Sequence, residues 1–322
     1  MSEKARIAVL TSGGDAPGMN AAIRSVVRNA LAQGAETVAI RHGYEGLIDG
    51  DFTTMEVSSV GGILDRGGTF IGTSRSERMF TDEGLDRCVE QLAAHGVTGL
   101  VVIGGDGTYR AAEKLDERGV RIIGVPGTID NDLAATDTTI GFDTAQNTIC
   151  DATSKVRDTA SSHERTFIIE VMGRECGMLA LYSGLAAGAD VILVPEVPWQ
   201  LEDICASVAQ GVTRGKKHTI IVVAEGAAHA FGLAEELSRA CGHEVRSVVL
   251  GHIQRGGSPS AFDRTLASRM GAAAVDALLD GESGKAVCLQ NADMALETFA
   301  VCYSHSHEMK RHIYDLAMVL AR

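Results

Sequence analysis

The segment Arg121–Asp132 reads RIIGVPGTIDND and joins a short apolar run to a polar loop. The run over residues 121–125 is too short for a helix and stops at a proline and a glycine, so it predicts a buried strand. Asp130 and Asp132 follow the end of this strand, and the hydroxyl of Thr128 lies beside them in the sequence. In open α/β sheets, ligands bind at the carboxyl ends of the strands. The segment therefore predicts an α/β fold with a functional loop at Asp130.

Apolar runs and amphipathic segments alternate along most of the chain in the same way. Alternating strands and helices predict parallel sheets that are covered by helices on both faces, and hence an α/β fold class. Strands are expected at residues 6–11, 38–41, 100–103, 121–125, 166–171, 191–194, 219–224 and 245–250. Helices are expected at residues 17–33, 85–95, 109–117, 143–159, 178–187, 201–213, 233–240 and 261–279.

The composition is that of an ordinary globular protein, with 45% hydrophobic and 22% charged residues. A length of 322 residues is a soft argument for two domains. The net charge is −13, from 29 basic and 42 acidic residues. This charge argues against duplex nucleic acid or an anionic membrane as the main partner. The 37 glycines accompany only five prolines, which indicates turns and close backbone approach rather than linkers.

The start of the chain carries no apolar signal region, and no stretch is long enough to span a bilayer. We therefore expect a cytoplasmic protein with no membrane contact. The cysteines occur at no metal-ligand or redox spacing, which predicts that all of them are reduced thiols. They are Cys88, Cys150, Cys176, Cys205, Cys241, Cys288 and Cys302.

Two glycine-rich loops each follow a predicted strand and precede a predicted helix. The first is SGGDAPG at residues 12–18, and the second is GGDGT at residues 104–108. Their glycines let phosphate approach the backbone, and the helix starts supply free N–H groups. Asp106 in the second loop is a candidate ligand for Mg²⁺. One such loop is equally well explained as a tight turn, but two favour phosphate binding. Neither loop matches the dinucleotide fingerprint or the Walker loop.

Asp130 and Arg174 are the candidate catalytic groups that follow strands. We interpret Asp130 as the base of a phosphoryl transfer, and the alternative is that Asp130 and Asp132 only cap a helix or form an Asx turn. Arg174 follows the strand at residues 166–171 and can direct a planar, permanently charged fork at a phosphate. Its alternative is a surface salt bridge. Basic groups recur at strand ends in this acidic chain, which favours the phosphate interpretation.

These loops resemble those of bacterial 6-phosphofructokinases, in sequence and in order along the chain. The segments that carry the resemblance cover most of the chain. They are TSGGDAPGMNAAIR (11–24), RGGTFIGTSR (66–75), GGDGT (104–108), PGTIDND (126–132), SSHERT (161–166), VMGR (171–174), GKKH (215–218) and LGHIQRGGSP (250–259). The GGDGT motif alone is weak, because NAD kinases and lipid kinases carry a similar one.

The resemblance implies two similar three-layer α/β domains with mostly parallel sheets, between which the chain crosses more than once. An ATP-binding domain would comprise residues 1–140 and 253–303. A domain that binds fructose 6-phosphate would comprise residues 141–252 and 304–322. The resemblance also implies a homotetramer in which Arg165 and Arg246 complete the substrate site of a neighbouring subunit.

The resemblance further implies a role for each matching residue of the active site. Asp130 would take the proton of the sugar 1-hydroxyl, Thr128 and Arg174 would stabilise the transferring phosphoryl group, and Asp106 would serve Mg²⁺ as the cofactor. The ATP contacts would be Gly14, Arg75, Ser76, Gly105, Asp106, Gly107 and Thr108. The fructose 6-phosphate contacts would be Thr128, Ile129, Asp130, Arg165, Met172, Gly173, Arg174, Glu225, Arg246, His252, Ile253, Gln254 and Arg255.

A regulatory pocket for ADP or phosphoenolpyruvate is also implied by the resemblance. Its matching positions are Arg24, Arg28, Arg157, Gly188, Asp190, Arg214, Lys216, Lys217 and His218. Val57 and Gly62 stand where members of the family carry arginine and aspartate, which predicts a weakened or altered response to the effectors. Ser76 replaces a common aromatic beside the adenine, which predicts a looser selectivity for the nucleotide.

The phosphoryl donor is predicted from two glycines. A pyrophosphate-dependent branch of the family has aspartate where this chain has Gly107 and lysine where it has Gly127. A side chain at Gly107 would occupy the region of the ATP α-phosphate, so glycine there predicts a glycolytic kinase that uses MgATP. The alternatives are a pyrophosphate-dependent enzyme and a non-catalytic sensor of sugar phosphate or nucleotide. The sensor would be expected to lack Asp130, Asp106 or Arg174. The role of Asp132 stays open, between serving the metal and holding the loop.

Overall fold

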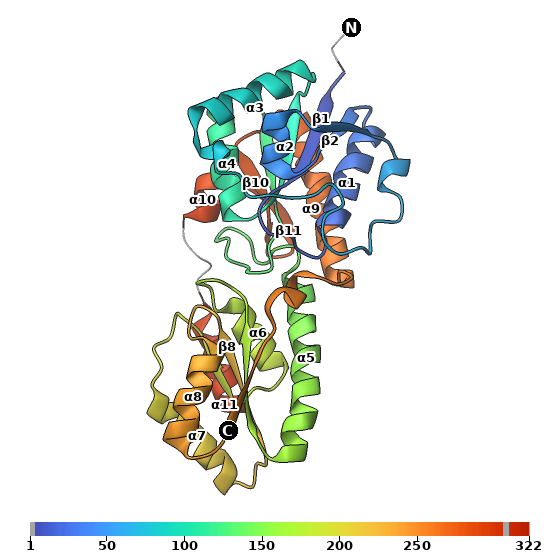
Figure 1. Cartoon of the computed structure of the whole chain (residues 1–322). Helices are drawn as coiled ribbons and strands as arrows, with labels where there is room; N and C mark the ends of the chain where they lie inside the picture. Colours follow the sequence, from blue (N-terminus) through green and yellow to red (C-terminus); the bar gives the residue numbers. More distant parts are fainter. Residues whose placement is uncertain (1–3, 305–308, 322) are drawn as a thin grey trace. The chain divides into compact units, whose positions relative to one another are not determined.

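The computed structural model describes residues 4–304 and 309–321, and it divides them into two compact units (Figure 1). Unit 1 contains residues 4–128, 133–143 and 255–304. Unit 2 contains residues 129–132, 144–254 and 309–321. The domains expected from the sequence change at residues 140 and 253, and these units change at residues 143 and 254. The sequence also predicts a change of domain after residue 303. This boundary lies next to residues 305–308, which are not among the residues that the structure describes.

Unit 1 is built on a seven-stranded sheet with the strand order β11-β10-β5-β4-β1-β2-β3. Its five inner strands run parallel to one another, and the edge strands β3 and β11 are antiparallel to their neighbours. The strands are β1 (Arg6–Thr11), β2 (Glu36–Ile40), β3 (Phe52–Met55), β4 (Gly99–Gly104), β5 (Ile122–Pro126), β10 (Lys285–Gln290) and β11 (Asp293–Thr298). The apolar sequences of β4 and β5 are buried throughout, as expected for strands covered on both faces.

Helices cover both faces of this sheet. The face that carries Leu10, Leu100 and Ile122 packs against α2, α3, α4 and α10, and α1 and α9 pack together on the other face (Figure 1). The helices are α1 (Met19–Ala32), α2 (Gly43–Asp49), α3 (Asp82–Ala94), α4 (Asp106–Asp116), α9 (Ala261–Leu279) and α10 (Phe299–Tyr303), with 3₁₀ turns at η1 (Ser58–Val60) and η2 (Arg78–Phe80).

Unit 2 contains a four-stranded parallel sheet with the order β7-β8-β6-β9. One face packs against α7 and α8 through a core that includes Ile168, Ile221 and Leu233, and α6 packs on β7 and β8 with α11 against it. The elements are β6 (Thr166–Val171), β7 (Val191–Leu193), β8 (Thr219–Ala224), β9 (Val245–Val249), α5 (Phe142–His163), α6 (Met178–Ala186), α7 (Leu201–Thr213), α8 (Ala230–Cys241), η3 (Gly251–Arg255) and α11 (Arg311–Leu320). The predicted α/β class with parallel sheets is confirmed.

The sequence patterns do not predict α2, β3, β10, β11, α10 or α11. The elements α2, β3 and α10 are short, with seven, four and five residues, and β11 has the burial pattern of a half-exposed edge strand, so the apolar signals of these four are weak. The start of α3 is also predicted three residues late. It begins at Asp82 because the Thr81 hydroxyl accepts a hydrogen bond from Gly84 N and caps the helix, whereas the apolar pattern starts at Leu85.

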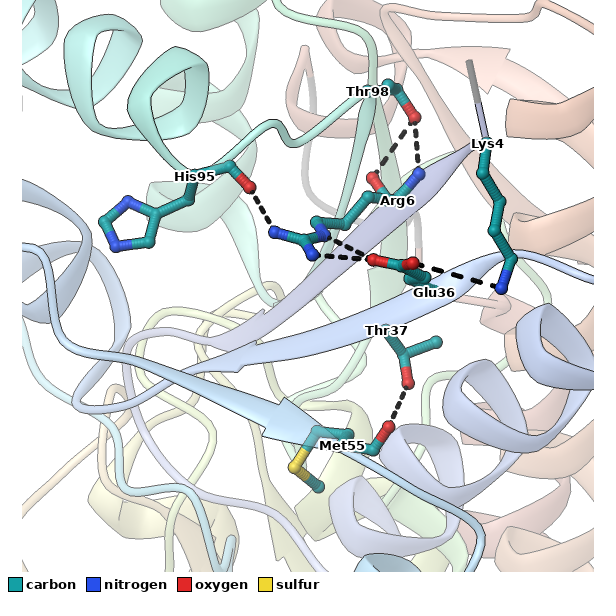
Figure 2. A network of polar contacts seen from close by, with 7 residues as sticks. All are labelled: Lys4, Arg6, Glu36, Thr37, Met55, His95 and Thr98. Carbon is teal, nitrogen blue, oxygen red and sulfur yellow. Dashed lines mark hydrogen bonds and ion pairs between the residues drawn. The ribbon is translucent and has the colours of Figure 1, made fainter. Parts of the chain in front are cut away.

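The amino ends of the central strands of unit 1 are joined by a network of polar side chains (Figure 2). The Arg6 guanidinium donates to the Glu36 carboxylate at 2.6 and 3.0 Å and to the His95 carbonyl at 2.8 Å. Arg6 N donates to Thr98 Oγ1 at 2.9 Å, which ties β1 to the start of β4. The hydrogen bond from Arg6 lowers the pKa of Glu36 below its ordinary value. The Lys4 ammonium adds a longer ion pair with Glu36, at 3.9 Å.

The expectation that all seven cysteines are reduced is wrong for one pair. Cys205 in α7 and Cys241 at the end of α8 form a disulfide, with 5.6 Å between their Cα atoms. The two residues are 36 positions apart, and packing of α7 against α8 brings them together, so sequence spacing gives no sign of the bond. The other five cysteines are free thiols.

The described residues contain no helix that is both long and apolar enough to cross a membrane.

Candidate active site

The first glycine-rich loop of unit 1 lies against the segment that contains Arg75 and Ser76. Gly13 N donates to the Ser74 carbonyl at 3.1 Å, and Thr73 Oγ1 donates to the Gly13 carbonyl at 2.9 Å. Arg75 itself is exposed and therefore accessible to a ligand. Unit 1 therefore brings three of the predicted ATP contacts, Gly14, Arg75 and Ser76, into one neighbourhood.

Arg255 also belongs to this neighbourhood. Its Nη1 donates to the Asp15 carbonyl at 3.1 Å, and a Cβ at Gly14 would overlap its guanidinium. The residue is 9% exposed, although arginine is rarely buried without a partner. A side chain at position 14 would therefore displace the Arg255 guanidinium from its place beside the loop.

The second glycine-rich loop lies beside the first. Thr108 Oγ1 donates to the Ser12 carbonyl at 3.1 Å, and a Cβ at Gly104 would lie 2.6 Å from the same carbonyl oxygen. The loop leads into α4, so the N–H groups of the first turn of α4, at Asp106 and Gly107, point away from the helix and favour an anion. The two loops thus lie together at the carboxyl ends of β1 and β4, where the N–H groups of the start of α4 favour negative charge.

Asp106 fits a role as a metal ligand. Its side chain is 39% exposed and lies 3.5 Å from the Arg110 guanidinium, so it is accessible and only loosely paired. The described residues contain no group of three or more histidine, cysteine, aspartate or glutamate side chains that could hold an ion by themselves. A single carboxylate next to a phosphate loop suits a cation such as Mg²⁺, which keeps several waters and binds substrate phosphates.

Thr128 lies at the end of β5, next to the second loop. A Cβ at Gly105 would lie 3.6 Å from Thr128 Cβ, so these two residues are close neighbours in unit 1. Thr128 is 8% exposed, and its backbone is bound to residues 139 and 140.

Unit 2 pairs the two predicted catalytic groups. Arg174 Nε lies 3.3 Å from Asp130 Oδ2, and the Asp130 side chain is only 1% exposed. Asn131 and Arg174 both adopt a left-handed backbone with φ of 53°. Such conformations cost about 1 to 3 kcal/mol each and persist where the surrounding structure imposes them, often at functional sites. A buried carboxylate beside a half-exposed guanidinium can accept a proton from a substrate while the cation faces a phosphate.

Glu225 and Gly226 hold Arg174 in this position. Arg174 N donates to Glu225 Oε1 at 2.8 Å, and a Cβ at Gly226 would overlap the Arg174 carbonyl oxygen. Unit 2 therefore brings Gly173, Arg174 and Glu225 together at the carboxyl ends of β6 and β8.

Gln254 has a different environment from the exposed residues beside it. It is fully buried, its Oε1 accepts from Met172 N at 3.1 Å, and its Nε2 donates to the Gly251 carbonyl at 2.9 Å. His252 and Ile253 are exposed. Gln254 therefore holds the Met172 backbone, whereas His252 and Ile253 are accessible to a ligand.

Cys176 lies near the loop that contains Asp130 and Asp132, and no sequence motif points to it. Burial raises the pKa of its thiol to about 12, and the nearby carboxylates of Asp132 and Asp130 act in the same direction. Its N–H donates to the Gly173 carbonyl at 2.9 Å. The residue is a protonated packing group rather than a nucleophile.

The predicted effector residues lie in both units. Arg24 and Arg28 lie on α1 of unit 1. In unit 2, Arg157 donates to the Gly188 carbonyl at 2.9 Å, and Lys216 Nζ lies 2.5 Å from Asp190 Oδ1. Asp190, Arg214 and Lys216 line a cavity of about 340 Å³ together with Trp199, Tyr314 and Met318.

Three further predicted cations of unit 2, Lys217, Arg165 and Arg246, are paired with glutamates. Lys217 lies 3.1 Å from Glu164, and His218, next along the chain, is partly exposed. Arg165 and Arg246 share Glu244, at 3.4 and 2.5 Å.

Glycine-rich loops after parallel strands, an accessible carboxylate at a helix start and a buried carboxylate beside an arginine define the class of protein as a phosphoryl-transfer enzyme of the α/β type. The family model described as Phosphofructokinase matches residues 6–278. The chain belongs to the phosphofructokinase family.

Similar proteins extend over nearly the whole chain. The ATP-dependent 6-phosphofructokinase of Brevibacillus brevis is 54% identical over 98% of this chain and 99% of its own length. The ATP-dependent 6-phosphofructokinase of Shouchella clausii is 52% identical over the same shares. The resemblance to bacterial 6-phosphofructokinases is thereby confirmed.

Solved structures of phosphofructokinases share the fold. The phosphofructokinase of Saccharomyces cerevisiae aligns with a TM-score of 0.89 and 35% identity over 99% of this chain, which spans 48% of that longer chain. A pyrophosphate-dependent phosphofructokinase from Marinobacter aquaeolei aligns with a TM-score of 0.85 and 26% identity, over 96% of this chain and 86% of that one. The fold is therefore shared with a protein that is named for pyrophosphate as its phosphoryl donor.

Proposed function

We propose that this protein transfers the γ-phosphoryl group of MgATP to the 1-hydroxyl of fructose 6-phosphate and forms fructose 1,6-bisphosphate and ADP. The observation that carries the proposal is the pair of Asp130 and Arg174, a buried carboxylate 3.3 Å from a guanidinium. It occurs in a chain that is 54% identical to a protein named ATP-dependent 6-phosphofructokinase. A sensor without catalysis would not need both groups together with Asp106.

In the proposed reaction the oxygen of the sugar hydroxyl attacks the γ-phosphorus, and the bond from that phosphorus to the β,γ-bridging oxygen breaks. Asp130 accepts the hydroxyl proton, and ADP leaves with the bonding electrons. Arg174 and the Thr128 hydroxyl stabilise the negative charge on the equatorial oxygens. Mg²⁺ held at Asp106 would neutralise charge on the nucleotide phosphates. The protein otherwise acts by positioning the two substrates, which is the main source of catalysis in phosphoryl transfer.

The donor site is proposed to be the loop edge of unit 1, and ATP is proposed as the donor. Gly107 faces open space, since a Cβ there would meet no atom within 4 Å, and this space suits a nucleotide phosphate. A Cβ at Gly127 would lie 3.0 Å from Ile103 and 3.1 Å from Met19, so the lysine of the pyrophosphate-dependent branch would be crowded there. Pyrophosphate dependence is the second candidate, because the fold is shared with a protein named pyrophosphate-dependent phosphofructokinase.

The fructose 6-phosphate site is proposed to use residues of unit 2 at the carboxyl ends of β6 and β8, with Arg165 and Arg246 serving a neighbouring copy in a homotetramer. Both arginines are partly exposed, and their shared partner Glu244 is 52% exposed, so a substrate phosphate can compete for them. ADP or phosphoenolpyruvate is proposed as the effector of the basic cluster around Lys216. A cytoplasmic location is part of the same proposal.

The test is an assay of the purified protein with fructose 6-phosphate and either MgATP or Mg-pyrophosphate, coupled to detection of fructose 1,6-bisphosphate. Turnover with MgATP alone is expected. Turnover with Mg-pyrophosphate alone would contradict the proposal and identify a pyrophosphate-dependent enzyme, the second candidate. A protein that binds both ligands in calorimetry but forms no product would be a sensor.

A further inference from the structure

The backbone of Thr128 is held by a segment that lies eleven to thirteen residues further along the chain. Thr128 N donates to the Ile140 carbonyl at 3.1 Å, and Ile140 N donates to the Pro126 carbonyl at 2.9 Å. Gly127 and Ile140 form an isolated parallel bridge. The Thr139 hydroxyl donates to the Thr128 carbonyl at 2.6 Å in a fully buried hydrogen bond. Residues 139–141, here called the support segment, therefore bind both backbone groups of Thr128.

Asp263 in turn holds the support segment. Its Oδ1 accepts from Gly141 N at 2.9 Å, and the residue is 0% exposed. A buried carboxylate is costly unless it is hydrogen-bonded, so this position has to be supported by specific contacts. Asp263 lies in the first turn of α9, where the positive end of the helix dipole favours an anion.

The start of α9 has a serine cap. Ser260 is the N-cap residue, and its hydroxyl accepts from Asp263 N at 3.1 Å. Leu266, Met270 and Ala274 anchor the helix in the core. The Asp263 carboxylate reaches from the helix to the support segment.

Two glycines leave the support segment little room to move. Gly141 has φ of +105°, and a Cβ there would lie 2.7 Å from Ala16 Cβ. Gly18 has φ of +108°, and a Cβ there would lie 2.6 Å from Ile140 Cγ2. Left-handed backbone and close contact both require glycine at these positions. The support segment is thus packed against the start of α1, next to the first glycine-rich loop.

We propose that Asp263 and Thr139 are positioning residues of the active site. Asp263 holds the support segment by its hydrogen bond from Gly141 N. Thr139 in that segment then holds the carbonyl of Thr128, which lies two residues before Asp130. The kinetic part of this inference rests on the proposed function. The physical reason is that a displacement of about 1 Å in a reacting group can lower a rate by about a hundredfold.

The first experiment compares Asp263→Ala with Asp263→Asn. The asparagine keeps a carbonyl oxygen that can accept from Gly141 N, whereas alanine leaves this buried donor without its acceptor. We expect kcat to fall about 10- to 100-fold in Asp263→Ala and about threefold or less in Asp263→Asn, with KM for MgATP changed less than kcat in both. Equal losses in the two variants, or a folded Asp263→Ala with the kcat of the unchanged protein, would overturn the inference.

The second experiment uses Thr139→Val, with Thr136→Val as the matched control. Thr136 is also buried, and its hydroxyl donates to the Thr138 carbonyl and accepts from Leu289 N, so it makes no contact with residues 127 and 128. We expect kcat to fall about tenfold in Thr139→Val and less than twofold in Thr136→Val. The double variant Asp263→Ala/Thr139→Val should lose less than the product of the two single losses, because both act through one segment. Independent, multiplying losses would contradict the proposal.

Amide hydrogen exchange of the peptide that contains residues 126–132 tests the same inference without any activity. We expect faster exchange of Thr128 N–H in Asp263→Ala and in Thr139→Val, and no change in Thr136→Val. If the protein had no kinase activity, this measurement would still decide whether the support exists. If Asp263→Ala failed to fold, Thr139→Val would decide the proposal alone, because it removes only one hydroxyl. Unchanged exchange of Thr128 N–H in Thr139→Val would then overturn the proposal.

Discussion

The two edges of the sheet in unit 1 are built from the same parallel strands and differ in how their polar groups are used. At the amino edge, the side chains of Arg6, Glu36 and Thr98 bind one another or the backbone (Figure 2). At the carboxyl edge, glycine-rich loops leave the N–H groups of a helix start available, and Asp106 is exposed. The comparison shows that polar residues at one edge complete the fold, whereas those at the other edge are arranged for a ligand.

The direction of the chain explains this difference. In a strand–loop–helix segment, the carboxyl end of the strand leads into the N-terminus of the helix, as β1 leads to α1 and β4 leads to α4. Helix N-termini attract anions, so phosphate sites arise at the carboxyl edge. The amino edge receives the C-terminal ends of helices, and there side chains such as Arg6 bind carbonyl groups such as that of His95.

The strongest test of the comparison is Asp130→Ser, which removes the proposed base that follows the carboxyl edge. We expect kcat to fall by about a hundredfold or more, the usual range for loss of a general base, and KM to change far less. The measurement is steady-state kinetics with fructose 6-phosphate and MgATP. Near-normal turnover would remove Asp130 from the mechanism.

The next test places a charge in the open space at the carboxyl edge. Gly107→Asp should raise KM for MgATP by about ten- to a hundredfold, because a carboxylate a few ångströms from a phosphate repels it in a medium of intermediate dielectric constant. Gly232→Asp, at an exposed glycine of α8 that also has open space around it, is the control and should leave KM unchanged. Equal KM values in the two variants would mean that Gly107 does not face the donor.

A smaller effect is expected for Arg174→Lys. The lysine keeps the positive charge but lacks the planar fork that lies against Asp130. We expect kcat to fall about tenfold, with the circular dichroism spectrum and thermal midpoint unchanged. An unaltered kcat would show that charge alone is needed at this position.

The smallest effect is expected at the amino edge, for Glu36→Gln. Activity should be unchanged, and Tm should fall only slightly at pH 7, because the pair with Arg6 is solvent-exposed. Since the folded pKa of Glu36 is lowered, its contribution is present above the unfolded pKa and is lost as pH falls through the folded value. The Tm difference between the variant and the unchanged protein should therefore shrink in acid. Any fall in kcat would contradict the division between the two edges.

Local sequence predicts the parts of the fold and site that depend on neighbours in the chain. The strand at residues 166–171, the helices at residues 201–213 and 261–279, and the loop around Asp130 are predicted because apolar period, proline and glycine are local signals. Contacts between distant segments have no such signal. Asp263 is 122 residues from Gly141, and Cys205 is 36 residues from Cys241, so neither contact can be read from spacing.

The order of segments in unit 1 has a consequence for synthesis of the protein. Its first 128 residues supply the strands β5-β4-β1-β2-β3. Strand β10, which pairs with β5, and helix α9, which covers α1, both come from residues 255–304. A ribosome that adds about 5 to 20 residues per second needs roughly 6 to 25 seconds to make residues 129–254. During that time β5 is an unpaired strand edge and the apolar face of α1 is uncovered. The nascent chain therefore passes through a stage in which a chaperone, or a second nascent chain, can bind the half-finished sheet before its own C-terminal part arrives.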